Sequence, residues 1–339
     1  MTKSEALNEF RQDLVSGEWV LFATGRAAKP NPKHIDTDNE EFRSKKNCPF
    51  EDIIGSGNEI LWLYPDDKNW DIAVIKNKYP ALMPGICVPS HTNGPFSINK
   101  AVGSHDVVVY KDHDTHFGDM TIEQLDSVTK IYKKRYNEIL ETGGDCTQHI
   151  MIFHNFGVGV GASLYHPHSQ IISMPILPPD ISRSLYGSQK FYKEKGQKIY
   201  DLLVNWEIEQ KNRIIYENEF FIAFCPFVSK YPYELRIFPK DGHAHFEKMP
   251  DPLDKYLADA MSVVFKKIKK ALNDPPYNFF IHTASVKEDP DNKFHEFYTW
   301  HIEIIPKLGM IGGFELGTGV YVNVVDPDEA AKLLRETNV

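Results

Sequence analysis

Two segments of the chain repeat one another in the same order, and this repeat restricts the fold more than any other feature of the sequence. The first copy runs through residues 78–80, 107–117, 149–155 and 166–175, and the second through residues 230–232, 236–246, 277–285 and 300–306. The intervals agree, because Lys111 precedes His154 by 43 residues and Lys240 precedes His282 by 42. Chance similarity would not preserve several intervals together, so we interpret the 339 residues as a diverged duplication of one structural unit.

Each copy has the pattern of a helix flanked by strands. In the first copy Thr121 and Gln124 have the spacing of a capping box, and apolar residues recur with helical spacing over 125–140. The second copy has the same spacing over 253–268, and Asn-Asp-Pro-Pro at 273–276 stops the helix. The other segments are short β-branched and aromatic runs bounded by Gly, Pro and Asp, as in strands. We therefore predict an α+β fold of two tandem halves with antiparallel sheets and flanking helices.

The repeat also suggests where the halves divide. We expect an N-terminal half at 1–185 and a C-terminal half at 186–339, with a polar connector over about 180–212. Residues 86–105 interrupt the first copy, and we interpret them as a surface loop. A last helix is predicted over 327–336, behind Asp326.

Composition excludes several classes of protein. The net charge of −9 argues against nucleic-acid binding, which requires basic surfaces. No segment is apolar enough to cross a membrane, and the first residues lack the apolar core of a signal peptide, so we expect a soluble cytoplasmic protein. The four cysteines are too sparse for a disulfide framework and are expected to be reduced thiols: Cys48, Cys87, Cys146 and Cys225.

One motif carries residues suited to chemistry. His166, Pro167, His168, Ser169 and Gln170 open a predicted strand and follow a glycine-rich turn at 157–163. Because side chains alternate along a strand, His166, His168 and Gln170 should share one face. The glycines allow backbone N–H groups to approach an anion closely. The motif therefore predicts a phosphate held beside an imidazole.

Histidine suits phosphoryl and nucleotidyl transfer. Its neutral ring is nucleophilic near neutral pH, and the phosphoramidate that it forms remains reactive. Gln170 can donate to a phosphate oxygen as charge develops there. A lone His-x-His is more often structural, but the glycine-rich turn beside it favours the chemical interpretation. The second copy keeps His301 but lacks the turn, so we interpret the second half as a scaffold.

These residues resemble the histidine-triad superfamily, and specifically its branch of galactose-1-phosphate uridylyltransferases and ADP-glucose phosphorylases. The resemblance covers nearly the whole chain and is carried by the motif at 166–170 and by residues 17–30, 76–80, 273–285, 298–306 and 312–323. It implies two histidine-triad-like halves and a homodimer with sites completed by the partner chain. It also implies a ping-pong reaction in which His168 attacks the α-phosphorus of a nucleoside diphosphate sugar and expels the sugar 1-phosphate.

The same resemblance assigns site residues by position. It implies catalytic roles for His168, Gln170 and Ser163, with nucleotide contacts from Arg26, Asn77, Asn155, Gly161, Ser163 and Gln170. It places possible sugar contacts at Phe314, Glu315, Tyr321 and Asn323, where the residues could also simply form a turn.

Metal binding depends on a departure from the family pattern. Family members often hold structural zinc with Cys-x-x-Cys and two histidines, and the matching positions here are Cys48, Glu51, His113 and His166. Zinc accepts carboxylate oxygen, so the site remains chemically feasible but weaker. A second, iron-binding site needs a glutamate and a paired His-x-His, whereas this chain has Ser184 and His301-Ile302-Glu303, so we expect no iron.

Several functions remain open at this stage. The leading one is transfer of uridylyl from UDP-glucose to a hexose 1-phosphate, and the second is phosphorolysis of a nucleotide sugar such as ADP-glucose by inorganic phosphate. A non-catalytic nucleotide-binding protein is the third. Hydrolysis is disfavoured because single-domain histidine-triad proteins have a third histidine where this chain has Gln170.

Overall fold

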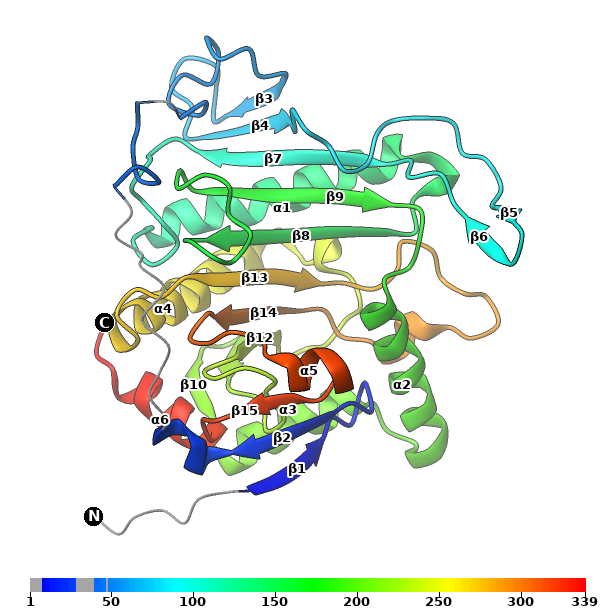
Figure 1. Cartoon of the computed structure of the whole chain (residues 1–339), viewed down its shortest axis with the longest axis vertical. Helices are drawn as coiled ribbons and strands as arrows, with labels where there is room; N and C mark the ends of the chain where they lie inside the picture. The colour runs from blue at the N-terminus through cyan, green and yellow to red at the C-terminus, as the bar shows by residue number, and fades with distance from the viewer. Residues whose placement is uncertain (1–7, 29–39, 47) are drawn as a thin grey trace.

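The computed structural model describes residues 8–28, 40–46 and 48–339, and all statements below concern these residues. One mixed α+β unit contains a three-stranded sheet, a ten-stranded sheet and a two-stranded hairpin (Figure 1). The strands are β1 Asn8–Gln12, β2 Trp19–Ala23, β3 Ile60–Tyr64, β4 Ile72–Lys76, β5 His91–Asn93, β6 Phe96–Ile98, β7 Ser104–Tyr110, β8 His149–Phe156, β9 His168–Met174, β10 Ile214–Glu217, β11 Phe221–Phe224, β12 Leu235–Pro239, β13 Tyr277–His282, β14 His301–Pro306 and β15 Tyr321–Asn323. The helices are α1 Ile122–Thr142, α2 Pro179–Lys195, α3 Ile199–Gln210, α4 Asp254–Ala271, α5 Gly313–Thr318 and α6 Pro327–Glu336.

The strand order of the large sheet has the symmetry that the sequence repeat predicts. The order is β10-β11-β12-β14-β13-β8-β9-β7-β4-β3, so each half contributes five strands and the halves meet where β13 pairs with β8. Reading outward from that junction gives β8, β9, β7, β4, β3 in one half and β13, β14, β12, β11, β10 in the other. The pairs within this sheet are antiparallel, as expected for an α+β fold.

The two equivalent helices cover one face of this sheet. α1 and α4 lie side by side behind it in Figure 1 and pack on its central strands in one continuous apolar core. Thr121 caps α1 in the expected capping box with Gln124. α6 begins behind Asp326, whose side chain accepts from Asp328 N–H, as expected.

The opposite face is covered differently in the two halves. α2 and α3, which form the connector, pack on β11 and β12 of the second half. In the first half a segment containing Phe50 and Ile53 packs on β4 and β7. Different segments therefore cover this face of the sheet in the two halves. Between them, β8 and β9 carry partly exposed side chains on this face.

A buried lysine connects the halves at the helix pair. Lys133 of α1 donates from Nζ to Asp251 at 2.8 Å, to Asp254 at 3.0 Å and to the Met249 carbonyl at 2.9 Å. Asp254, the first residue of α4, is fully buried. Charges removed from water need such partners, so this cluster fixes α1 against the start of α4.

The insertion in the first half is an exposed arm that includes the β5–β6 hairpin, at the right of Figure 1. A disulfide joins Cys87 of the arm to Cys146 near the end of α1, with a Cα–Cα distance of 5.5 Å. The expectation of four reduced thiols is therefore wrong for this pair, because 59 residues of sequence separation conceal their proximity. No helix among the described residues is long and apolar enough to span a membrane.

Candidate active site

His168 is held in a defined orientation at the start of β9. Its Nδ1 lies 2.8 Å from the His166 carbonyl oxygen, which can only accept, so Nδ1 carries a proton and donates. Burial lowers the pKa of His168, which favours the neutral ring. The Nε2 lone pair of that ring is then available as a nucleophile.

His168 is buried beneath a covering segment rather than open to solvent. His168 is only 6% exposed, and the Phe50 ring packs edge-to-face against it at 5.4 Å. The covering segment around Phe50 is remote in sequence, so the strand pattern alone could not show this contact. The cover excludes water from one side of the imidazole.

The glycine-rich turn has the predicted backbone freedom. Gly157, Gly159 and Gly161 have φ values of 88°, 80° and 88°, a region that residues with a Cβ rarely adopt. The turn is fixed from the second half of the chain, because Asn278 of β13 donates to the Val160 carbonyl at 2.8 Å. Ser163, in the same turn, is exposed.

Two side-chain amides lie on the same face of the sheet as His168. Asn278 donates to Asn155 Oδ1 at 2.7 Å, and Gln170 Oε1 lies 2.8 Å from His105 Nε2. Both amides are thus engaged through their oxygens, which leaves their N–H donors to face an anion. The sequence patterns identified Asn155 and Gln170, whereas Asn278, inside the segment 273–285, and His105, at the end of the 86–105 insertion, received no role.

Ser169 faces the opposite side of β9. It is fully buried beneath the active strand and contacts Tyr110 Oη at 2.7 Å, Tyr132 Oη at 2.6 Å and His154 Nδ1 at 3.0 Å. Tyr132 belongs to α1, so this network ties the motif to the helix layer. It gives Ser169 a positional role that its place in the motif does not reveal.

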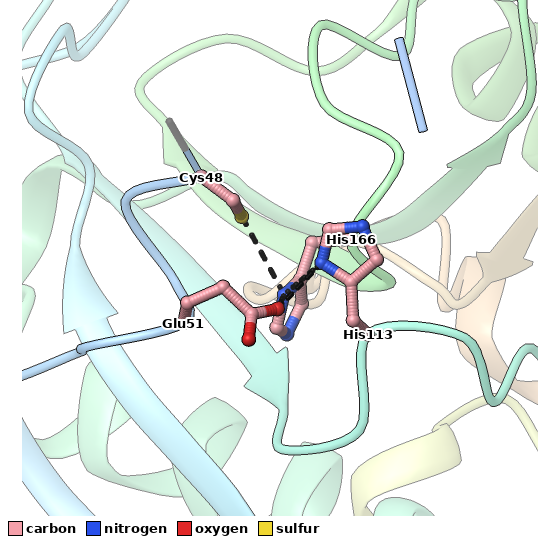
Figure 2. A group of neighbouring side chains, drawn as sticks. All are labelled: Cys48, Glu51, His113 and His166. Carbon is pink, nitrogen blue, oxygen red and sulfur yellow. Dashed lines mark hydrogen bonds and ion pairs between the residues drawn. The ribbon is translucent and has the colours of Figure 1, made fainter. Parts of the chain in front are cut away.

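Cys48, Glu51, His113 and His166 converge as the sequence predicts (Figure 2). One candidate ligand atom from each lies within 4.8 Å of all the others. His113 Nδ1 lies 2.6 Å from Glu51 Oε1 and 3.1 Å from His166 Nδ1, and Cys48 Sγ lies 3.5 Å from His166 Nδ1. These residues form a candidate metal centre.

The histidine orientations fit a bound cation. His166 Nε2 donates to the Tyr110 carbonyl at 2.6 Å, and His113 Nε2 donates to the Arg43 carbonyl at 3.1 Å. Both rings therefore direct Nδ1 toward Glu51, at 2.6 Å from His113 and 3.3 Å from His166, where a metal ion or a proton shared with the carboxylate supplies positive charge. Outer hydrogen bonds of this kind are typical of metal-ligating histidines. The same His166 supplies the carbonyl that orients His168.

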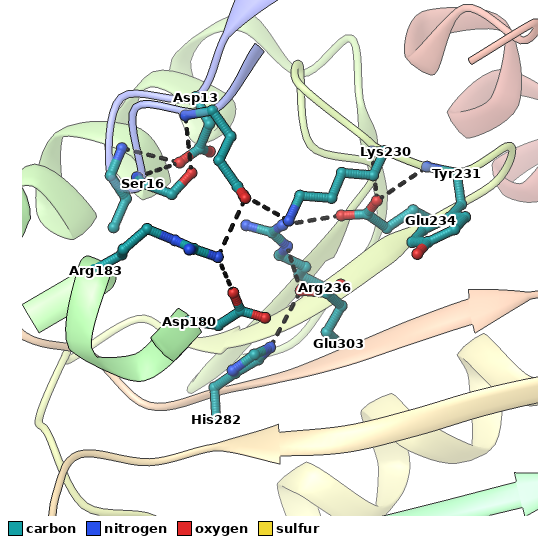
Figure 3. Close-up of polar contacts among 12 residues, drawn as sticks. Asp13, Ser16, Asp180, Arg183, Lys230, Tyr231, Glu234, Arg236, His282 and Glu303 are labelled. Atoms are coloured by element: carbon teal, nitrogen blue, oxygen red, sulfur yellow. Dashed lines mark hydrogen bonds and ion pairs between the residues drawn. The ribbon is translucent and has the colours of Figure 1, made fainter. Parts of the chain in front are cut away.

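The second half has a polar cluster at the equivalent place (Figure 3). Val107 pairs with Gln170, and its repeat equivalent Arg236 pairs with Glu303, so Glu303 stands where the first half has Gln170. His301 then corresponds to His168, and its Nδ1 likewise donates to a carbonyl two residues earlier, that of Thr299, at 3.1 Å.

The register corrects one equivalence drawn from spacing. Phe153 pairs with Gln170 as Phe280 pairs with Glu303, so His282 corresponds to Asn155 rather than to His154. The loops that precede β8 and β13 differ in length, and this accounts for the different spacing.

An ion-pair network fills this second cluster. Arg236 lies between Glu234 at 2.9 Å and Glu303 at 3.3 Å, and His282 lies 3.2 Å from Glu303 (Figure 3). Burial opposes ionisation of Glu303, but the Arg236 guanidinium holds its pKa below the usual range. His282, His301 and Glu303 also have the proximity of a metal-binding group. Arg236, however, already supplies Glu303 with the positive charge that a metal ion would bring.

Asn77 follows β4 and lies at the edge of this site, with its amide nitrogen 3.0 Å from His105 Nε2. Arg26 is exposed in a short 3-10 helix at Thr24–Ala28. Gly161 is exposed in the turn.

The predicted sugar contacts lie on elements of the second half. Phe314 and Glu315 are in α5, which lies over that half in Figure 1, and Tyr321 lines a cavity beside the Arg236 network. Asn323 is fully buried, and its amide donates to Ser229 and Tyr231, so the prediction that it binds sugar is wrong.

Two further histidines are buried in the structure. His116 is 5% exposed and packs between the rings of Phe156 and Tyr165, and His245 is 9% exposed beside His295. Burial lowers the pKa of His116 to about 3, so this ring is neutral.

Comparison with known proteins gives consistent matches over the chain. Residues 1–178 match the family described as galactose-1-phosphate uridyl transferase, N-terminal domain, and residues 96–337 match a domain of unknown function. The ADP-glucose phosphorylase of Arabidopsis thaliana is 34% identical, over 98% of this chain and 93% of the relative. The galactose-1-phosphate uridylyltransferase of Thermotoga maritima is 31% identical, over 98% of this chain and 99% of the relative. A crystal structure of an ADP-glucose phosphorylase from Arabidopsis thaliana with bound ADP-glucose superposes with a TM-score of 0.83 at 32% identity, covering 98% of this chain and 100% of the other.

Proposed function

The chain belongs to the galactose-1-phosphate uridylyltransferase and ADP-glucose phosphorylase branch of the histidine-triad superfamily, and we propose that His168 is its covalent nucleophile. The substrate is a nucleoside diphosphate hexose. The Nε2 lone pair forms a bond to the α-phosphorus while the bond from that phosphorus to the bridging oxygen breaks, and the electron pair leaves on the sugar 1-phosphate. An oxygen of a second phosphate then attacks the nucleotidyl-histidine and releases the imidazole.

The observation that carries this proposal is the fixed tautomer of His168. Its Nδ1–H is engaged by the His166 carbonyl, and burial favours the neutral ring, so no side-chain base is needed to prepare Nε2. When the N–P bond forms, the ring becomes positively charged and the same carbonyl stabilises the Nδ1–H. The N–H donors of Gln170 and Asn155 face the side where charge on phosphate oxygen would develop.

We propose phosphorolysis of ADP-glucose as the first candidate reaction. It is supported by 34% identity over 98% of the chain and by the structural similarity to a protein with bound ADP-glucose. Uridylyl transfer from UDP-glucose to a hexose 1-phosphate is the second candidate, supported by the Thermotoga maritima relative. This order reverses the one that sequence motifs favoured.

Turnover with matched substrate pairs tests the choice. The purified protein is given ADP-glucose with inorganic phosphate in one reaction, and UDP-glucose with galactose 1-phosphate in the other. We expect faster release of glucose 1-phosphate in the first reaction. Faster turnover in the second would assign the protein to the uridylyltransferases, and activity in neither would remove both candidates.

We further propose that the Cys48, Glu51, His113 and His166 centre binds zinc in a structural role. A Cys, Glu, His, His donor set suits tetrahedral zinc, with one thiolate fewer than a Cys₂His₂ set. Zinc there would fix His166, whose carbonyl orients His168. The centre thus supports the nucleophile without taking part in the reaction.

Replacing Glu51 by cysteine should increase zinc retention during treatment with a chelator. A second thiolate gives a softer and tighter donor set, and we expect the fraction of zinc retained to rise at least about threefold. Metal analysis of both proteins after dialysis measures this, with Asp52→Cys, one residue away, as the matched control. Near-zero zinc in wild type and Glu51→Cys would show that the chain has lost the site.

We also propose that the protein is a homodimer, with α5 completing the partner's site. Large apolar side chains are exposed on the arm, where Ile86 is 79% and Phe96 69% exposed, and on α5, where Leu316 is 78% exposed. Such exposure is typical of interaction surfaces. Phe314 and Glu315 lie in the same α5 and would reach sugar in the partner's site rather than in their own.

Replacing Phe96 by aspartate should convert the dimer to monomers of 38.9 kDa. Burying the aspartate charge in an apolar interface removes its hydration, which weakens association. The dissociation constant of the dimer should therefore rise at least about 100-fold. Sedimentation velocity measures the change, and Ser97→Asp, the next residue along β6, is the control because its side chain points to the other face. A monomeric wild-type protein would contradict the proposal, and a dimeric Phe96→Asp protein would exclude the arm from the interface.

A further inference from the structure

His105 of β7 joins two parts of the candidate site without belonging to any motif. It is 9% exposed, and its ring bridges the end of β4 to β9. Nδ1 accepts from the Ala81 backbone N–H at 3.1 Å, and Nε2 lies 2.8 Å from Gln170 Oε1 and 3.0 Å from Asn77 Nδ2. No other role in the site has been assigned to this side chain.

The contact with Ala81 determines which ring nitrogen carries the proton. A backbone N–H can only donate, so Nδ1 of the neutral ring must present its lone pair and Nε2 must carry the hydrogen. Nε2–H then donates to Gln170 Oε1. Asn77 Oδ1 accepts from the Tyr79 backbone N–H at 2.8 Å, so the Asn77 amide nitrogen faces Nε2 at 3.0 Å as a second donor and makes no hydrogen bond with Nε2–H.

This donation determines the orientation of the Gln170 amide. With Oε1 bound to His105, the NH₂ group of Gln170 must point to the other side, where it can donate to phosphate oxygen. A Gln170 side chain rotated by half a turn would present Oε1 to the phosphate, and the two oxygens would repel each other. A donor helps the reaction only if it is already aimed at the oxygen where charge develops.

We propose that His105 is a positioning residue that holds the amide N–H groups of Gln170 toward the phosphate. The inference rests on the proposed function, because it requires Gln170 to donate to a phosphate of the nucleotide. His105 itself does not touch the reacting atoms. Its loss should lower kcat more than it raises KM, since the oriented donor matters most when charge develops in the transition state.

Two substitutions separate this role from a merely structural one. In His105→Gln the amide nitrogen replaces Nε2 and keeps the donor to Gln170 but loses the acceptor for Ala81. In His105→Asn the amide oxygen replaces Nδ1 and keeps the acceptor for Ala81 but loses the donor to Gln170. We expect His105→Gln to retain kcat within about threefold, and His105→Asn to lose about 10- to 100-fold.

A double-mutant cycle with Gln170→Ala completes the test. The single Gln170→Ala variant should slow turnover, and adding His105→Asn to it should cost little more, since the residue that His105 positions is gone. Thermal melting of each variant confirms that the fold is retained. Loss of activity in His105→Gln but not in His105→Asn would instead assign His105 to holding the Ala81 segment, and additive losses in the cycle would equally overturn the proposal.

The same experiment distinguishes failure of the inference from failure of the proposed function. If the wild-type protein turns over neither substrate pair, the proposed function fails. If Gln170→Ala turns over as fast as wild type, the transfer reaction stands but Gln170 does not donate in it, and the inference about His105 fails. If Gln170→Ala is slow while His105→Asn is fast, Gln170 keeps its proposed role and only the inference about His105 is wrong.

Discussion

Replacing His168 by asparagine should reduce nucleotidyl transfer at least about 10⁴-fold, because the reaction then has no nucleophile to split it into two steps. Asparagine keeps a polar group that can donate to the His166 carbonyl, so the local hydrogen bond at 2.8 Å has a replacement. The fold should therefore persist. Steady-state turnover and the thermal melting curve of the same preparation measure both expectations.

His301→Asn is the matched control for this substitution. His301 occupies the equivalent strand position, is similarly buried at 5% exposed, and makes the same type of bond to a carbonyl two residues earlier. We expect its activity to remain within about threefold of wild type, since the Arg236 network rather than a glycine-rich turn lies beside it. Turnover in His168→Asn comparable to that of His301→Asn would remove His168 from the mechanism.

Replacing Lys133 by alanine should destabilise the protein by about 3 kcal/mol at pH 7.5, because it leaves the fully buried Asp254 without its charge partner. Urea unfolding of the two proteins measures the difference. Both halves should still unfold in one transition, at lower urea, because they share one continuous apolar core.

The destabilisation should depend on pH in a defined direction. Burial already raises the pKa of Asp254 to about 6, and removing Lys133 should raise it further. The folded carboxyl then keeps its proton at pH values where the unfolded one has lost it, so stability of the variant falls as pH rises from about 4 to 7.5. The cost should accordingly be smaller at pH 5 than at pH 7.5.

Lys130→Ala is the control, because its exposed i,i+4 pair with Asp126 is worth only about 0.3 kcal/mol. A cost for Lys133→Ala no greater than that of Lys130→Ala would contradict the structural role given to the buried cluster.

Much of the fold could be predicted from the sequence because its signals are local or repeated. The capping box at Thr121 and the Asp326 cap define helix starts through contacts within a few residues, and both are present in the structure. The repeat predicted two equivalent halves, and the strand order has that symmetry. The convergence of Cys48, Glu51, His113 and His166 could be predicted only through resemblance, since 118 residues separate Cys48 from His166.

Other features depend on contacts that leave no pattern in the sequence. Phe50 covers His168, and Asn278 holds Asn155 across the junction of the halves. Spacing also misassigned His282 by one position, and a one-residue error in register places a side chain on the other face of a strand. Burial of Asn323 and pairing of Cys87 with Cys146 are likewise tertiary outcomes.

Intact mass spectrometry of the protein after incubation with ADP-glucose or UDP-glucose, without a phosphate acceptor, tests the central claim most directly. The account predicts that wild-type protein gains the mass of one nucleotidyl group, that the group maps to the peptide carrying His168, and that it is discharged by inorganic phosphate or a hexose 1-phosphate. The added mass identifies the nucleotide as AMP or UMP. Product formation in a single turnover with no adduct on His168, or an equal adduct on His168→Asn, would contradict covalent catalysis by this histidine.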